Sequence, residues 1–236
     1  MSWFPYPKTN HGVPILSRED IDSIGEHTAN IQYPHEVDIE LIAEKSGYIM
    51  DFQSLSHNGC YLGMAVFLST DYIPVYDEEH HCADFYHADK GTILIEKNLI
   101  CQNMNRYRFT VGHELGHQEL HQDYFQWLQY QNCKEAQGVL CRSTWRKPKR
   151  EERTDIDWIE YHANAFAAAT LMPRCAFIEL VRCYDSLQDN PVPCIDEASK
   201  VFGVSPHAVC LRLNELKLSN YSYDTYCLSR YGVATQ

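Results

Sequence analysis

Apolar positions recur along the chain with two different periods, which divide it into helical and extended parts. Ser17 precedes Ile21, Ile24 and Ala29 at helical spacing, and a second helical pattern runs from about residue 36 to residue 46. Short β-rich runs, broken by Gly, Asn, Asp and Pro, then follow at 48–52, 63–68, 72–76 and 91–96. The chain afterwards returns to helical spacing, at 106–131, 157–171, 174–187, 195–202 and 206–217. Strands followed by a run of helices predict an α+β fold with an antiparallel or mixed sheet.

Length and composition indicate one globular domain. The chain has 236 residues, of which 44% are hydrophobic, and this is enough to bury a core without disulfides. We therefore expect a single domain over residues 1–236, with residues 192–236 packed on it as a helical C-terminal extension. The N-terminus has no basic start followed by an apolar run, and the longest apolar runs, such as Met64 to Leu68, are too short to span a membrane. A cytoplasmic protein without membrane contact is the prediction.

The chain is rich in cysteine and histidine. It has 10 cysteines but no Cys-x-x-Cys pair. Because disulfide frameworks are typical of shorter, secreted chains, we expect reduced cysteines, most of them buried as small apolar side chains. The 12 histidines are the more unusual excess.

Acidic residues outnumber basic ones, which limits the possible partners. With 32 Asp and Glu against 20 Lys and Arg, the net charge is −12, and a general binder of nucleic acids or anionic membranes is not expected. The last two helices have a helix-turn-helix outline, with Ser205 placed as N-cap before Pro206. The second of them offers only Arg212 as a clear contact to a base or phosphate, whereas recognition helices use several. We interpret the pair as a packed support and expect no direct nucleic-acid binding.

Basic residues concentrate in one irregular stretch between Cys133 and Asp155. Seven of the 20 lie there, and six of these fall between residues 142 and 153: Arg142, Arg146, Lys147, Lys149, Arg150 and Arg153. A solvated surface excursion is the simple interpretation, and a substrate-docking or gating loop is the alternative.

One predicted helix carries two histidines a single turn apart. Residues 109 to 121 read Phe-Thr-Val-Gly-His-Glu-Leu-Gly-His-Gln-Glu-Leu-His. His113 and His117 leave the same face, so both imidazoles can bind one ion, and Glu114 beside them can reach a water on that ion. Gly116 costs a helix about 1 kcal/mol relative to Ala, which indicates that close packing or an open metal face matters there. The pattern predicts a zinc site with Glu114 as its catalytic carboxylate.

A catalytic zinc site needs a third protein ligand. His121 lies about 12 Å along the helix axis from His113, too far for two Zn–N bonds of about 2 Å, so we interpret it as a packing or supporting residue. The next helix is a better source, because Glu160 and Asn164 lie one turn apart on its polar stripe. Glu160 would complete a site of two histidines and a glutamate, and Asn164 can accept an N–H from a ligating histidine. The alternatives near the same helix are Asp155, Asp157 and His162.

Another group of possible metal ligands comes earlier in the chain, within the sequence His80-His81-Cys82-x-Asp84-x-x-His87. It lies in an acidic stretch without regular spacing. We expect these side chains to be exposed in a loop, with metal binding as the alternative.

The motifs of the two helices resemble those of the ImmA/IrrE family of metallo-endopeptidases. The resemblance rests on the segments Arg108-Phe-Thr-Val-Gly-His-Glu-Leu-Gly-His117, Glu160-x-x-Ala-Asn164-x-Phe-Ala167 and Leu171-Met172-Pro173. That family has a zincin-like fold, binds zinc through two histidines and a downstream glutamate, and cleaves repressors of the phage-type helix-turn-helix class that control stress or mobile-element genes. The resemblance implies that His113, His117 and Glu160 are zinc ligands and that Glu114 is the base.

The function predicted from the sequence is therefore that of a zinc endopeptidase. Zinc-bound water, assisted by Glu114, would attack a peptide bond of a regulatory protein, expected to be a helix-turn-helix repressor. The substrate would add as an extended strand to an edge strand at 91–96, over the active-site helix. The alternatives are a metal-binding transcriptional regulator that contacts DNA and a metal-binding protein without turnover, such as a sensor or a toxin-antitoxin partner.

Overall fold

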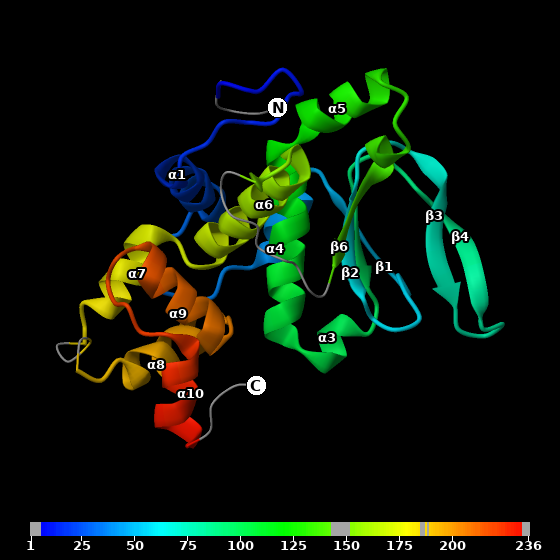
Figure 1. Ribbon diagram of the computed structural model, residues 1–236. Coiled ribbons are helices and arrows are strands. Elements are labelled where there is room, and N and C mark those ends of the chain that lie inside the picture. The colour runs from blue at the N-terminus through cyan, green and yellow to red at the C-terminus, as the bar shows by residue number, and fades with distance from the viewer. Residues whose placement is uncertain (1–5, 143–151, 185–186, 188, 233–236) are drawn as a thin grey trace.

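A computed structural model describes residues 6–142, 152–184, 187 and 189–232. Its helices and strands are largely segregated, as in an α+β fold (Figure 1). The helices are α1 (Arg18–Ala29), α2 (Ile39–Lys45), α3 (Leu99–Gln102), α4 (Met104–Leu120), α5 (Gln122–Tyr130), α6 (Asp155–Leu171), α7 (Arg174–Val181), α8 (Val192–Phe202), α9 (Pro206–Glu215) and α10 (Tyr223–Tyr231). The strands are β1 (Ile49–Gln53), β2 (Tyr61–Val66), β3 (Thr70–Asp77), β4 (Cys82–Ala88), β5 (Thr92–Glu96) and β6 (Gly138–Arg142), and a short 3-10 turn, η1 (Lys134–Gln137), precedes β6. This architecture is consistent with a zincin-like fold.

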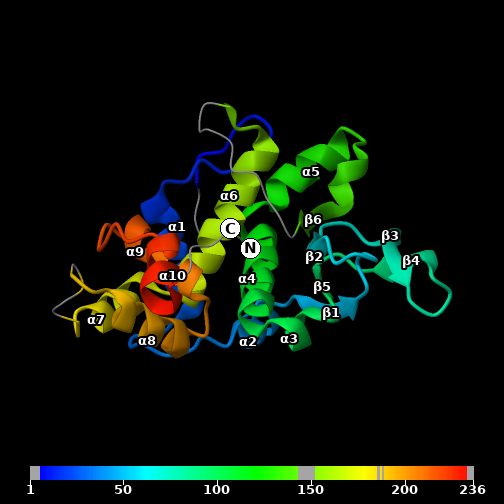
Figure 2. The same cartoon turned by 60° about the horizontal axis from the view of Figure 1, so that its bottom comes forward.

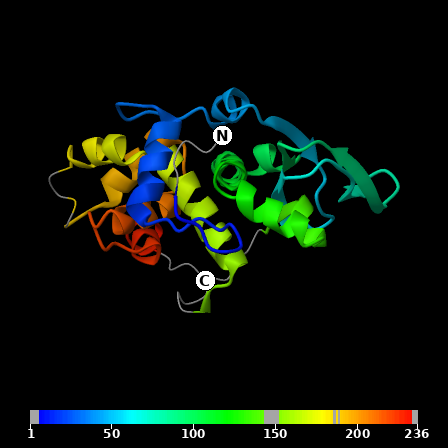
Figure 3. The ribbon, with the colours of Figure 1, turned by 90° about the horizontal axis from the view of Figure 1, so that it is seen from above.

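Helices α4 and α6 lie at the centre of the molecule, packed against each other. Seen from above, the sheet lies on one side of α4, and α1 with the C-terminal helices lies on the other side, beyond α6 (Figure 3). The same separation is visible in the tilted view, where α7, α8 and α10 are far from the strands (Figure 2). The two central helices are therefore the elements through which both halves of the fold meet.

The local signals at helix starts work as expected. Ser17 and Asp20 form a reciprocal capping box at the start of α1. Thr154 and Asp157 form another at the start of α6, so this helix begins at residue 155 instead of 157. Gly47 has a φ of +86°, a conformation that favours glycine, and it follows the last turn of α2.

The main sheet corrects the expectation of an edge strand at 91–96. Within the described residues its strand order is β1-β5-β2-β6, with β1 parallel to β5 and the other neighbouring pairs antiparallel. Strand β5 is thus interior, and all of its residues are buried. Its run of Ile93, Leu94 and Ile95 is typical of a strand covered on both faces. The edge next to β2 is formed by β6, which comes from the stretch that we expected to be irregular.

Several further elements differ from the prediction. The expected helix at 106–131 is interrupted at His121, whose φ of −119° and ψ of 12° separate α4 from α5. Residues 82–88 pair with β3 as strand β4, although most of them are exposed. Helix α7 ends at Val181 instead of near residue 187, and α3 and α10 were not expected. An exposed hairpin and a break within a helical pattern leave little trace in the hydrophobic spacing.

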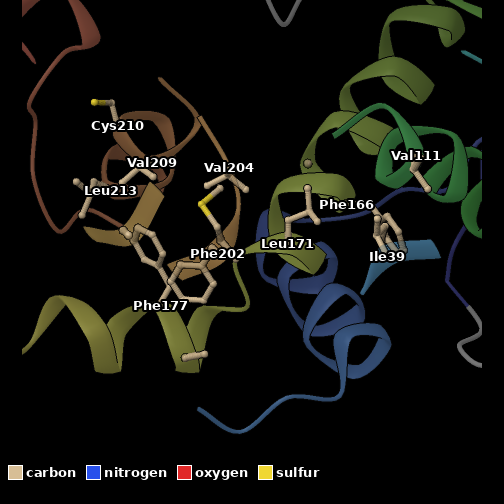
Figure 4. Close-up of a cluster of buried hydrophobic side chains, with 14 of the residues drawn as sticks. Ile39, Val111, Phe166, Leu171, Phe177, Phe202, Val204, Val209, Cys210 and Leu213 are labelled. Carbon is tan, nitrogen blue, oxygen red and sulfur yellow. The ribbon is translucent and has the colours of Figure 1, made fainter. Parts of the chain in front are cut away.

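The C-terminal helices share a hydrophobic core with the central pair. Buried side chains of one continuous cluster come from α4 and α6 as well as from α8, α9 and α10. Phe177 and Phe202 lie near Val209 and Leu213 in this cluster, and Val111 and Phe166 belong to its part near the central helices (Figure 4). Residues 192–232 are therefore packed onto the rest of the molecule.

Arg212, which the sequence offered as a contact to DNA, is buried. Its guanidinium donates a 2.6 Å hydrogen bond to Asp22 on α1 and a 3.2 Å hydrogen bond to the carbonyl of Met172. A buried arginine is stable when it is paired in this way. In this fold Arg212 ties α9 to α1 and is not available to a phosphate.

The cysteines are all free thiols, but fewer are buried than we expected. Cys194, Cys210 and Cys227 are buried, three others are half-buried, and Cys82, Cys101, Cys175 and Cys183 are exposed. Of the six basic residues from 142 to 153, Arg146, Lys147, Lys149 and Arg150 lie outside the described residues. Among the described helices, none combines the length and apolar character that a membrane span requires.

Candidate metal centre

Small residues allow α4 and α6 to approach closely at the level of the two histidines. A Cβ atom on Gly116 would lie 2.9 Å from Cδ1 of Phe166 and 3.2 Å from Cα of Ala163. One turn earlier, Gly112 faces Ala167 at 3.3 Å in the same way. Of the two reasons that we considered for a glycine at 116, close packing is the one that the fold provides.

This approach brings His113 and His117 of α4 together with Glu160 of α6. The two Nε2 atoms are 3.0 Å apart, and the Glu160 carboxylate oxygens lie 3.5 Å from Nε2 of His113 and 3.4 Å from Nε2 of His117. All three side chains are buried, with Glu160 the most exposed at 8%. Because one donor atom from each lies within 4.8 Å of the others, the three residues can hold one metal ion.

Asn164 lies behind His113. Its Oδ1 is 3.2 Å from Nδ1 of His113, and its amide nitrogen donates a 2.8 Å hydrogen bond to the carbonyl of Glu160. The amide is therefore oriented to accept the Nδ1 proton of His113, which leaves Nε2 with a lone pair for a metal. Burial, and then His117, lower the pKa of His113 to about 4, which also favours the neutral ring.

His121 supports His117 in a similar manner. Nδ1 of His121 is 3.0 Å from Nδ1 of His117, and its own ring stacks on that of His162 with centroids 5.8 Å apart. Burial lowers the pKa of His121 well below its ordinary value, so the ring is neutral and can accept the proton from His117. His121 thus lies in the supporting position for which we considered it, and it contacts His117 where α4 ends.

The other candidate ligands of the α6 region lie elsewhere. Asp155 pairs with His11 at 2.6 Å, and Asp157 caps its own helix. His162 packs between His121 and Trp158. Among the described residues, the structure groups none of these three with the histidine pair as a possible metal site.

Replacing His121 by Ala is expected to lower metal affinity by roughly 10- to 100-fold, the usual effect of losing a residue that orients a metal ligand. The cause is that His117 loses the acceptor that holds its ring and its tautomer. Competition with a chromophoric chelator measures the change. His80→Ala is the control, because His80 is exposed in the β3–β4 hairpin and its loss should leave the metal affinity unchanged. Equal metal affinity of the His121 variant and the parent would contradict a supporting role for His121.

Glu114 faces β2 and β6 and is fully buried. A Cβ atom on Gly63 of β2 would lie 2.7 Å from its Oε1, so only glycine leaves room for the carboxylate there. Burial, and then Glu160, raise the pKa of Glu114 well above its ordinary value, while the backbone N–H of Ala65 and the thiol of Cys141 lower it.

Gly63 and Cys141 are the site residues that the sequence analysis missed. Gly63 began a predicted strand, but nothing local indicated that it faces Glu114. Cys141 lies opposite Gly63 in the β2–β6 pair, and the strand β6 was itself not predicted. The earlier group at 80–87 is not brought together as a metal site among the described residues; His80 instead pairs with Asp77 at 2.7 Å, within the hairpin.

Comparison with known families agrees with this geometry. Residues 145–214 match the peptidase M78 family model, described as the IrrE N-terminal-like domain. This segment of the chain is therefore similar to the ImmA/IrrE metallopeptidases. The matched segment contains Glu160 and Asn164, whereas His113, Glu114 and His117 precede it. No curated protein matches the chain. Similarity to a metallopeptidase family points to a bound metal, and His113, His117 and Glu160 are residues that can hold one.

Proposed function

We propose that the protein is a zinc-dependent endopeptidase, with His113, His117 and Glu160 as metal ligands and Glu114 as the catalytic base. The observation that carries this proposal is the meeting of three buried donor side chains from α4 and α6 beside a buried carboxylate. The similarity of residues 145–214 to the peptidase M78 family supports the same reaction class.

The donor set suits zinc better than the common alternatives. Two imidazole nitrogens and one carboxylate oxygen are a usual protein contribution to catalytic zinc sites, whereas Mg²⁺ and Ca²⁺ prefer oxygen donors throughout. The neutral state of His113 and the hydrogen bonds behind both histidines favour the metal-binding form of the rings. A zinc ion held there would supply Lewis acidity to a water molecule and to the scissile carbonyl.

Glu114 performs the proton transfers in the proposed reaction. Its buried carboxylate takes a proton from the attacking water and delivers it to the nitrogen of the leaving amine. The burial that raises the pKa of Glu114 makes it a stronger base than an exposed carboxylate. Gly63 keeps the space that the carboxylate occupies, and the Ala65 N–H helps to orient it.

The substrate peptide would lie along β6 instead of along the strand at 92–96. Strand β6 has a neighbour on one side only in the described part of the sheet, so its outer backbone groups can pair with an extended peptide. Cys141 places this strand within reach of Glu114. A peptide on this edge would bring its backbone to the catalytic carboxylate.

Two cavities in the described part of the molecule adjoin the metal ligands through Asn164. Their volumes are about 410 and 450 Å³, and both are lined by Phe109, Ala208 and Leu211, from α4 and α9. These apolar walls suit a hydrophobic side chain of a protein substrate. We propose that residues of α9 contribute to substrate selection in this way.

A helix-turn-helix repressor is the proposed substrate, on the basis of the family resemblance, and the cytoplasm is the proposed site of the reaction. The test is to incubate the zinc-loaded protein with a repressor encoded beside its gene. A single cut, located by mass spectrometry and prevented by a chelator, is the expected result. Unfolded repressor serves as a control, because cleavage at many sites in it would indicate a contaminating protease. A zinc-loaded preparation that leaves the folded repressor intact would contradict this substrate, and metal-independent binding to DNA would favour the regulator alternative.

A further inference from the structure

Arg106 lies on the face of α4 that carries His113 and His117. It is exposed, in the first turn of the helix, and it precedes His113 by two turns, so both side chains leave the same side of α4. Burial, and then Glu114, raise the pKa of the Cys141 thiol on β6 well above its ordinary value, whereas the positive charge of Arg106 acts to lower it. The guanidinium is therefore within electrostatic reach of the strand along which the substrate is proposed to lie.

Arg106 also lines the cavity of about 450 Å³ that adjoins Asn164. Among the described residues around this cavity, it is the only Lys, Arg, Asp or Glu. Phe109 and Leu211 supply an apolar part of the wall, and Leu211 is half exposed. A further cavity, toward the loop before β2, is also lined by Arg106. The cavity next to Asn164 thus offers one positive charge beside an apolar surface, which suits a ligand with an anionic group and a hydrophobic group.

Two neutral hydrogen-bond donors line the same cavity. Oδ1 of Asn103 accepts the backbone N–H of Arg106, so the NH₂ group of this amide remains able to donate. Oγ of Ser205 accepts the backbone N–H of Ala208, and its hydroxyl hydrogen likewise remains a donor. A carboxylate accepts hydrogen bonds only, and it pairs with a guanidinium through a favourable planar geometry. The polar part of this cavity therefore matches a carboxylate better than it matches a cation or an amide.

We propose that Arg106 selects substrates that carry an acidic side chain near the scissile bond, beside a hydrophobic side chain. This inference rests on the proposed function, which places the scissile bond at the metal centre. Seven helical residues rise by about 10 Å and an extended peptide advances about 3.3 Å per residue, so the acidic side chain lies about three positions from the cut. A guanidinium has five N–H donors, so Arg106 can bind this carboxylate and keep its contacts within the protein.

The first test determines which peptides the zinc-loaded full chain cuts. The protein digests a library of amidated ten-residue peptides of mixed sequence, and mass spectrometry identifies the cut sites. We expect the parent to favour Asp or Glu over Asn or Gln roughly three- to tenfold at one position about three residues from the cut. Arg106→Gln should lose this preference, and Arg106→Glu should favour Lys or Arg at the same position. Arg182→Gln is the matched control, because Arg182 is exposed at the end of α7 and should leave the preference unchanged.

The outcomes of this digestion separate the two proposals. Cuts by the parent without any acidic preference near them would overturn the role of Arg106 and leave the proposed function standing. An equal acidic preference in the parent and in Arg106→Gln would do the same. A zinc-loaded parent that cuts no peptide and no repressor would instead overturn the proposed function. A reversal of charge preference in Arg106→Glu would support the role of Arg106, because a merely structural residue would not produce it.

The second test measures binding by the full chain and needs no turnover. The ¹⁵N-labelled parent is titrated with N-acetyl-Leu-Glu-amide, and the Nε–H signal of Arg106 is identified by its loss in Arg106→Gln. We expect this signal to shift, and we expect N-acetyl-Leu-Gln-amide to bind roughly three- to tenfold more weakly, because it lacks the carboxylate. Equal shifts with the two amidated peptides would overturn the proposal. A shift only with N-acetyl-Leu-Gln that has a free C-terminal carboxylate would also overturn it, because the cavity would then bind a chain end instead of an acidic side chain.

Discussion

Glu114→Gln is expected to retain stoichiometric zinc and to cleave its substrate roughly 10² to 10⁴ times more slowly than the parent, the range that general acid–base catalysis usually supplies. The glutamine side chain has nearly the same shape, so it fits against Gly63, where the carboxylate now lies. It cannot take a proton from water at any working pH. Metal content by atomic emission and the initial rate of repressor cleavage measure the two properties separately.

The matched control for this prediction is Glu119→Gln, on the same helix and one residue from the end of α4. Glu119 is partly buried beside Tyr48 and lies away from the metal ligands, so its variant should cleave at a rate close to that of the parent. If the Glu114 variant cleaved as fast as the Glu119 variant, Glu114 would not be the base. If the Glu114 variant lost zinc, Glu114 would instead be a ligand.

Glu160→Ala is expected to lose the metal under conditions in which the parent retains it. Glu160 supplies the only ligand from outside α4 in the described three-residue group, and its oxygens lie about equally far from both histidine Nε2 atoms. The affinity should fall by more than the roughly 10- to 100-fold expected when an orienting partner is lost, because a ligand itself is removed. Zinc content after dialysis against a chelator, and cleavage activity, should decrease together.

Asp157→Asn provides the comparison for Glu160→Ala. Asp157 was an alternative ligand on the same helix, but it caps the N-terminus of α6 through Thr154. Its variant should keep the metal and lose at most about 1 kcal/mol of helix stability, because only the charge of the residue paired with Thr154 is removed. Stoichiometric zinc in Glu160→Ala would disprove the ligand assignment, and loss of zinc in Asp157→Asn would point to the alternative.

Local patterns predicted the parts of the fold that depend on neighbouring residues. The capping box of Ser17 and Asp20 involves atoms within one helical turn. The same holds for His113 and His117, because a helix places residues four apart on one face regardless of what surrounds it. The cost of a glycine within a helix marked Gly116 as unusual. The sequence around Gly116 does not indicate that α6 is the helix that packs against it.

Elements that depend on distant partners were predicted less well. Strand β5 was expected at an edge, because the sequence of a strand does not indicate how many neighbouring strands it has. Its five residues are buried because β1 and β2 pair with it on both sides. Strand β6 pairs with β2 across a separation of more than 70 residues, and the helix breaks at His121, whose ring is buried against His117 inside the fold. Such features are decided by packing, which a hydrophobic period does not record.

The sequence by itself determined the chemical character of this protein: a pair of histidines and a glutamate on one helix, with a second helix that offers Glu160 and Asn164 one turn apart. The tertiary structure decided how these groups are used. Close contact at Gly116 brings Glu160 to the histidines, and the β2–β6 pair brings Gly63 and Cys141 to Glu114. The reason is that side-chain spacing along one helix follows from its own geometry, whereas a site shared by helices and strands exists only after the core has set their distances.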